Sequence, residues 1–76
     1  ATNPELPPAQ AIDAGLARVE GIFSSMEKQG RVVVDGNDGG GVYSTYGIPP
    51  ELVESLSAER NFTFDVEGFR QAMVQH

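Results

Sequence analysis

The sequence has no cysteine and no tryptophan, and its one histidine is the final residue, His76. The lack of cysteine excludes disulfide bonds and thiolate zinc sites, and a single histidine excludes a His-rich metal site. A Ser–His–Asp triad would need His76 as its base, at a chain end where order is usually poor. The absence of cysteine fits a reducing compartment, so we expect a cytoplasmic protein.

Positive charge is scarce as well. Five Lys and Arg residues stand against eleven Asp and Glu residues, which gives a formal net charge of −6. The basic residues are scattered along the chain, at Arg18, Lys28, Arg31, Arg60 and Arg70. Free-standing nucleic-acid binders cluster such residues against phosphates, so the composition argues against one. A segment of a larger RNA-binding protein needs fewer of them.

Long apolar runs are missing too. No stretch approaches the roughly 20 apolar residues of a membrane span, and no signal peptide pattern is present, so we expect no membrane partner. The length of 76 residues allows one small domain, which we place at residues 9–76, after a flexible Pro-rich lead-in at residues 1–8. Because the chain begins with Ala1 rather than Met, we expect a piece of a longer protein.

Three stretches do show apolar residues at helical spacing. The stretch 9–29 carries a single stripe, made of Ile12, Leu16, Val19, Phe23 and Met26. The stretch 49–60 begins at a Pro-Pro pair, which is tolerated in the first turn of a helix. The stretch 65–75 begins at Asp65, a favourable N-cap residue. The sequence therefore predicts three amphipathic helices.

The segments between these helices predict little regular structure. Residues 31–34 and 62–64 are rich in β-branched and aromatic residues, which favour at most a minimal β pair. Residues 35–41 read DGNDGGG and predict a flexible turn or loop, because glycine permits many backbone conformations. A short helical turn near 42–46 follows. The expected fold class is mainly α.

The glycine-rich stretch matches no ligand-binding loop. An EF-hand needs oxygen ligands at its fifth and twelfth positions, where this chain has Gly39 and Tyr46. A P-loop needs a lysine after its glycines, and Val42 follows them here. We therefore predict no metal site, and we find no set of side chains that predicts a catalytic site.

One string is more specific. Residues 42–49 read V-Y-S-T-Y-G-I-P, which resembles the L-Y-D-T-Y-G-F-P signature of alanyl-tRNA synthetases. Upstream, residues 15–20, GLARVE, are similar to a G-L-x-x-L-E helix of that family. Downstream, further matches follow at the family's spacing, at Leu52, Glu59-Arg60, Phe62-Thr63-Phe64, Asp65, Gly68-Phe69, Met73 and Gln75. The resemblance covers residues 9–76, and it implies a helix over residues 38–46, where local propensity favours a glycine loop followed by the short turn near 42–46.

The resemblance implies a segment from the C-terminal end of the helical tRNA-recognition region, behind the aminoacylation domain. The parent would be an ATP-dependent alanine–tRNA ligase that uses ATP and magnesium, whereas this segment would hold no cofactor and no catalytic residue. Its implied partners are the acceptor stem of tRNA(Ala), through the parent, and the rest of the synthetase. The implied recognition residues are Ser44, Thr45, Tyr46 and Gly47, and Arg60 and Arg70 are candidate phosphate contacts.

The chain departs from the family at Ser44, where the signature has aspartate. In the family this aspartate helps to read a wobble G·U pair, and a carboxylate can accept hydrogen bonds from the guanine amine in the minor groove. A serine hydroxyl can accept one hydrogen bond but carries no charge. Ser44 therefore leaves open whether G·U reading persists in this chain.

A second interpretation is a protein-interaction or scaffold module of a synthetase paralogue that does not contact RNA. Its acidic surface and the apolar stripe of residues 12–26 would then dock another domain or chain. Exposure of the same stripe predicts self-association of the isolated chain, which sedimentation can test.

Overall fold

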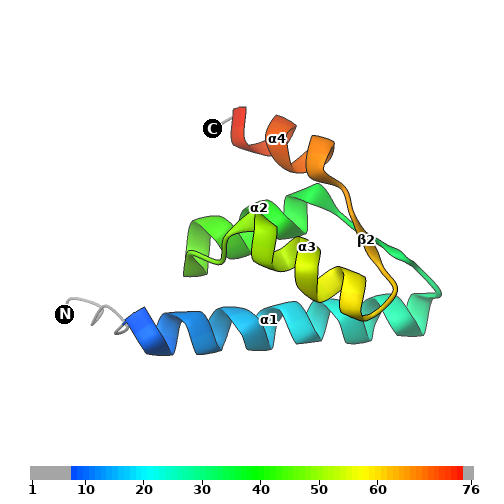
Figure 1. The fold of residues 1–76 in the computed structure, drawn as a ribbon, viewed down its shortest axis with the longest axis horizontal. Helices are drawn as coiled ribbons and strands as arrows, with labels where there is room; N and C mark the ends of the chain where they lie inside the picture. The colour runs from blue at the N-terminus through cyan, green and yellow to red at the C-terminus, as the bar shows by residue number, and fades with distance from the viewer. Residues whose placement is uncertain (1–7, 75–76) are drawn as a thin grey trace.

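The computed structural model describes residues 8–74, which form four helices and two short strands (Figure 1). The elements in chain order are α1 (Pro8–Gln29), β1 (Val33–Val34), α2 (Gly36–Tyr46), α3 (Pro50–Glu59), β2 (Thr63–Phe64) and α4 (Val66–Val74). The mainly helical class with a minimal strand pair is thereby confirmed. The predicted lead-in lies outside the described residues, except for Pro8, which is the first residue of α1.

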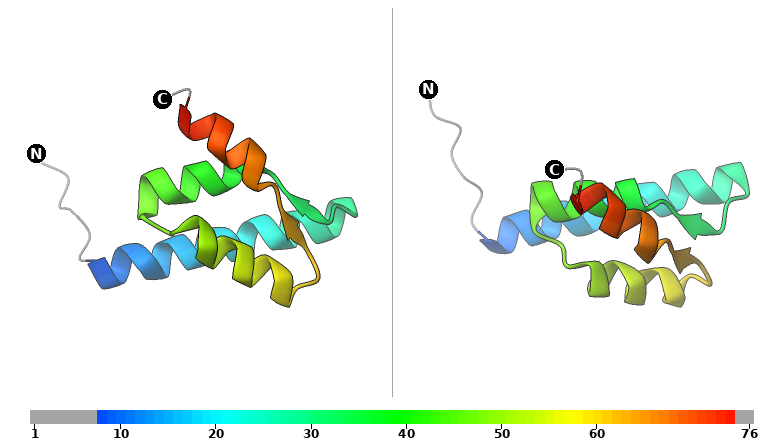
Figure 2. Two further views of the ribbon diagram at one scale, coloured as in Figure 1. Left: turned by 45° about the horizontal axis from the view of Figure 1, so that its top comes forward. Right: turned by 90° about the horizontal axis from the view of Figure 1, so that it is seen from above.

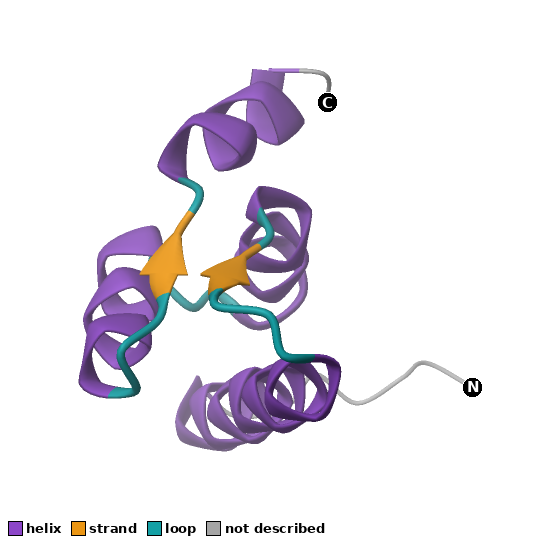
Figure 3. Cartoon of the chain, turned by 90° about the vertical axis from the view of Figure 1, so that its right-hand side faces the viewer, coloured by secondary structure: helices purple, strands orange, loops and turns teal. Residues whose placement is uncertain are grey.

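The helices are arranged around α2. The long α1 runs along one side of the molecule, α2 and α3 lie over it, and α4 lies on the far side (Figures 1 and 2). Helix α2 contacts α1, α3 and α4, whereas α3 packs mainly against β2 and α2. In Figure 3 the two strands lie side by side, between α1 below and α4 above. No helix in this described part is long and apolar enough to cross a membrane.

The three predicted helices are confirmed, and nearby proline and aspartate residues explain where each one begins. Helices α1 and α3 begin at Pro8 and Pro50, because a first-turn residue needs no N–H for an intrahelical bond. Helix α4 begins after Asp65, whose Oδ1 accepts a hydrogen bond from the Gly68 N–H at 2.9 Å. Its predicted last residue, 75, lies outside the described residues.

The strand pair is parallel, with Val34 beside Phe64 in register. Each strand runs into a helix through one aspartate, Asp35 before α2 and Asp65 before α4. The Asp35 Oδ1 accepts a hydrogen bond from the Asn37 N–H at 2.8 Å. The order strand, aspartate, helix thus occurs twice, and the parallel pairing sets the first turns of α2 and α4 close together.

The structure corrects the prediction for the glycine-rich stretch. Residues 35–41 are not a flexible loop, and the helical turn near 42–46 is not a separate short element. Both belong to α2, a continuous helix of 11 residues. Of the predicted loop, only Asp35 lies outside the helix, and it serves as the N-cap.

Close packing explains why glycine is tolerated inside α2. A Cβ atom on Gly36 would overlap the backbone where Gly68 meets Phe69 in α4, and one on Gly39 would overlap the ring of Phe64. Each glycine disfavours the helix by about 1 kcal/mol relative to alanine. The close approach of β2 and α4 supplies tertiary contacts that offset this loss of helix stability. Helix propensity, read from the sequence, does not include such contacts.

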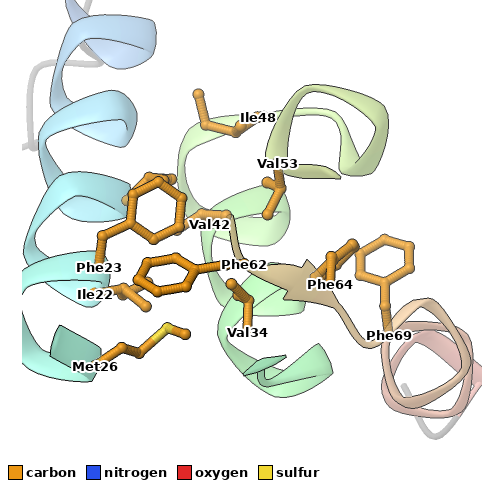
Figure 4. Packing of buried hydrophobic residues seen from close by; sticks show 11 residues of the cluster. Ile22, Phe23, Met26, Val34, Val42, Ile48, Val53, Phe62, Phe64 and Phe69 are labelled. Atoms are coloured by element: carbon orange, nitrogen blue, oxygen red, sulfur yellow. The ribbon is translucent and has the colours of Figure 1, made fainter. Parts of the chain in front are cut away.

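The core gathers apolar side chains from all six elements (Figure 4). Its buried members are Val19, Ile22, Phe23, Met26, Val34, Val42, Ile48, Val53, Phe62, Phe64 and Phe69. The rings of Phe23 and Phe62 lie 5.4 Å apart between centroids. The predicted stripe on α1 is buried from Val19 onward, while Leu16 is half-buried and Ile12 is 38% exposed. The stripe is therefore used mainly inside this fold.

Candidate functional site

The recognition residues implied by the signature lie at the end of α2. Ser44 and Thr45 are exposed on its last turn. Gly47 ends the helix with a φ of 74°, a left-handed conformation that favours glycine. Its N–H donates to the Tyr43 carbonyl at 2.9 Å. Gly47 thus has a clear structural role, as the turn that follows two exposed hydroxyl side chains.

The two tyrosines of the signature face different surroundings. Tyr43 is 45% exposed, and its ring meets the Phe69 ring of α4 edge-on, with centroids 5.9 Å apart. Tyr46 is half-buried and packs against the core. Packing therefore accounts for Tyr46, whereas Tyr43 combines a packing contact with an accessible ring surface.

The signature contacts the upstream motif that also resembles the family. Ile48 is fully buried and lies against Gly15 of α1. A Cβ atom on Gly15 would lie 2.6 Å from the Ile48 Cγ1 and 2.8 Å from the Tyr46 Cβ. Two matched motifs far apart in the sequence thus form one contact, which fixes the end of α2 against α1.

The two candidate phosphate contacts, Arg60 and Arg70, lie outside α2, which carries the implied recognition residues. Arg60 follows α3, and its guanidinium forms an ion pair with Glu20 of α1. It also lies 3.9 Å from Glu27 and 5.4 Å from the centroid of the Phe23 ring. A phosphate at Arg60 would have to displace these carboxylates. A phosphate contact at Arg60 therefore stays a prediction, and Glu20 and Glu27 would compete with the phosphate for the guanidinium group.

Arg70 lies on the exposed surface of α4. Its Nη1 is 3.6 Å from a carboxylate oxygen of Glu67, one helical turn away. An exposed pair of this kind contributes little to stability, so it would yield readily to another anion. The proposed role of Arg70 also stays a prediction.

Sequence reasoning missed a groove between α1 and α2, which we call the α1–α2 groove. It consists of two adjoining hollows of about 230 and 200 Å³, and both are bordered by Arg18, Ile22 and Asp38. The first hollow extends to Thr45 and the second to Arg31. Helical periodicity places Arg18 on the polar face of α1, about 120° from the centre of the apolar stripe, and the opposite wall belonged to a segment expected to be a loop.

The chemistry of this region suits binding. Exposed hydroxyl groups and guanidinium groups can donate hydrogen bonds to an anionic or polar partner. Within residues 8–74, no three acidic or histidine side chains gather closely enough to hold a metal ion.

Comparison with known proteins gives a consistent set of relatives, although no family model matches the chain. The chain is 48% identical over 65 residues to an alanine–tRNA ligase of Rhodopirellula baltica, which covers 86% of this chain and 7% of that protein. Alanine–tRNA ligases of Streptococcus thermophilus and Nostoc are each 38% identical, over 67 and 64 residues. These alignments cover 88% and 84% of this chain, and 8% and 7% of the relatives. The chain thus spans less than a tenth of the length of the relatives it matches.

Proposed function

We propose that this chain, which is homologous to a segment of alanine–tRNA ligases, belongs to the part of such an enzyme that recognises the acceptor stem of its tRNA. The segment would stand at the C-terminal end of the helical tRNA-recognition region of a cytoplasmic parent. Ligation, with ATP and magnesium, would belong to the rest of that parent. The observation that carries the proposal is the end of α2, where Ser44 and Thr45 are exposed beside the hydrogen-bonded Gly47 cap.

The geometry of this helix end fits double-stranded RNA. The minor groove of A-form RNA is wide and shallow, and it presents base edges and 2′-hydroxyl groups. Short polar side chains on an exposed helical turn can reach such a surface. The Ser44 hydroxyl can accept a hydrogen bond from a guanine amine, and Thr45 can donate to a 2′-hydroxyl. The buried Ile48 anchors the turn, so the hydroxyl groups of Ser44 and Thr45 are held in place before RNA binds.

The direct test is a titration of a labelled tRNA(Ala) acceptor-stem minihelix with the 76-residue chain at low salt. A second minihelix carries G·C in place of the G·U pair. We expect Ser44→Asp to increase the preference for G·U about fivefold, because a charged acceptor forms a stronger hydrogen bond than a hydroxyl. Ser55→Asp, at an exposed serine of α3, is the control for added negative charge.

Two results would contradict the proposal. One is an equal change in preference for Ser44→Asp and Ser55→Asp, which would mean that the end of α2 does not read the pair. The other is an absence of binding by every variant, which would favour the scaffold interpretation.

One observation supports that alternative, a protein-interaction module that does not contact RNA. An apolar hollow of about 520 Å³ lies between α2, α3 and α4, lined by Tyr43, Pro49, Pro50, Phe69 and Met73 among others. Under this alternative, the hollow would receive another part of the synthetase. Tyr43→Ser would then weaken association with the remainder of the parent, as sedimentation of the mixed parts would show, and neither the unaltered chain nor the variant would bind the minihelix.

A further inference from the structure

We infer that the α1–α2 groove binds the phosphodiester backbone of the RNA, with Arg18 and Arg31 as its phosphate contacts. The inference rests on the proposed function and deepens it, because it assigns the backbone contacts to residues other than Arg60 and Arg70. Phosphate contacts position an RNA strand, while the end of α2 would read its base edges.

Helix α1 separates its charges onto two flanks. Successive residues turn by about 100°, so Arg18 and Glu20 point about 160° apart around the helix axis. On one flank, Glu20 and Glu27 face Arg60. On the other flank, Arg18 shares the groove with Ser25 and Gln29, which follow it at helical spacing. The buried stripe lies between the flanks, so the acidic side chains point away from the groove.

The groove leads from the proposed reading site along α1. Its first hollow is bordered by Arg18 together with Thr45 and Tyr46 of the signature. Its second hollow ends at Arg31, two residues beyond α1. The helix rises about 16 Å from residue 18 to residue 29, a length that spans several phosphates of one strand. A strand that meets Thr45 can therefore continue along the groove to Arg31.

The two arginines of the groove are free of ion pairs with the other described residues, where a pair means an approach of 4.0 Å or less. Arg60 and Arg70 each have a carboxylate partner within this distance. Asp38 supplies the one carboxylate that borders the groove, against the two guanidinium groups. Among the residues that border it, the groove therefore has two cationic groups against one carboxylate, on a chain with a net charge of −6, while Arg31 also borders a neighbouring hollow together with Asp35 and Asp65. A guanidinium group also matches phosphate in shape and can bond it through two N–H groups.

The test measures minihelix binding by the 76-residue chain across a series of salt concentrations. We expect Arg18→Gln and Arg31→Gln each to weaken binding several-fold at low salt. Each should also reduce the slope of log affinity against log salt by about 0.7 to 0.9, the value for one lost phosphate contact. Arg18→Lys should retain most of the slope and lose part of the affinity. Lys28→Gln is the matched control, because Lys28 is an exposed cation of α1 that does not border the groove.

The outcomes separate this inference from the proposed function. If the unaltered chain binds and the arginine variants behave like Lys28→Gln, the groove assignment is wrong, while recognition by α2 is still supported through Ser44. If Arg18→Gln and Arg31→Gln reduce the affinity and the salt slope while Lys28→Gln does not, the groove binds the RNA backbone. If the unaltered chain binds no RNA at low salt, both proposals are wrong. Far-ultraviolet circular dichroism of each variant confirms that the fold is retained.

Discussion

At the scale of single residues, Gly15 shows how the absence of a side chain supports the site. The end of α2 reaches α1 only because no Cβ atom stands between Gly15 and Ile48. The contact holds Tyr46 and the following turn in position, and the exposed hydroxyl groups of Ser44 and Thr45 depend on that turn. A residue far from the signature in sequence therefore controls its geometry.

We expect Gly15→Ala to lower the free energy of unfolding by about 1 to 3 kcal/mol, because the added methyl group overpacks against Ile48 and Tyr46. The matched control is Gly21→Ala, in the same helix, where an added Cβ meets nothing within 4 Å. That control should stabilise the chain by about 1 kcal/mol through helix propensity. Urea denaturation of both variants measures the difference. Equal effects would contradict the proposed contact.

Arg60 gives a prediction of smaller size. Its side chain is 38% exposed and its partner Glu20 is 55% exposed, so solvent screens their attraction. We expect Arg60→Gln to lower the free energy of unfolding by less than about 1 kcal/mol, including the lost contact with the Phe23 ring. Denaturation at low and at high salt checks this, since the difference from the unaltered chain should shrink as salt rises. A loss of several kcal/mol would show a larger structural role for the pair.

At the scale of secondary-structure elements, α2 depends on glycines that sequence propensity counts against it. We expect Gly36→Ala to be strongly destabilising, because its Cβ would overlap the backbone of α4. Gly41→Ala should stabilise the same helix by about 1 kcal/mol, since Gly41 is exposed and an added Cβ meets nothing within 4 Å. Thermal unfolding followed by circular dichroism distinguishes the two. Similar effects at both positions would mean that packing against α4 does not explain the glycines.

The elements also show which features can be predicted from sequence. The first residues of α1, α3 and α4 could be predicted, because prolines and an aspartate cap act within one helical turn. Helix α2 was not predictable from local propensity, because its glycines are explained only by the packing of Phe64 and α4 against them, although the resemblance implied a helix over residues 38–46. The α1–α2 groove was missed for the same reason, since one of its walls is α2. Long-range packing, absent from any local pattern, decides both features.

The residues of the candidate site divide in a similar way. The signature string identified Ser44 and Thr45, and the structure places both on the surface. The string could not show that Arg60 already faces two carboxylates of α1, because those partners lie far away in the sequence. Charge partners of this kind depend on how helices are placed, and residue type alone does not predict them.

At the scale of the whole molecule, the apolar surface available for the predicted self-association is smaller than the full α1 stripe. The α1 stripe is buried from Val19 onward, which leaves Ile12 as its exposed member. We expect the isolated chain to associate weakly through such apolar residues, and Ile12→Ser to reduce the association. Sedimentation velocity over a range of concentrations measures it. A monomer at every concentration of the unaltered chain would contradict the prediction.

The parallel strand pair has a consequence for the order in which the chain folds during synthesis. The Thr63 N–H bonds the Val32 carbonyl at 2.9 Å, and the Asp65 N–H bonds the Val34 carbonyl at 3.0 Å. Helices α2 and α3 both lie between these partners in the chain, so neither bond can form until the ribosome has released β2. The ring of Phe62, which packs on Phe23, emerges at the same stage. A nascent chain that stops at Glu59 therefore carries three of the four helices described for residues 8–74, and its core stays open until the residues through Phe69 have left the exit tunnel.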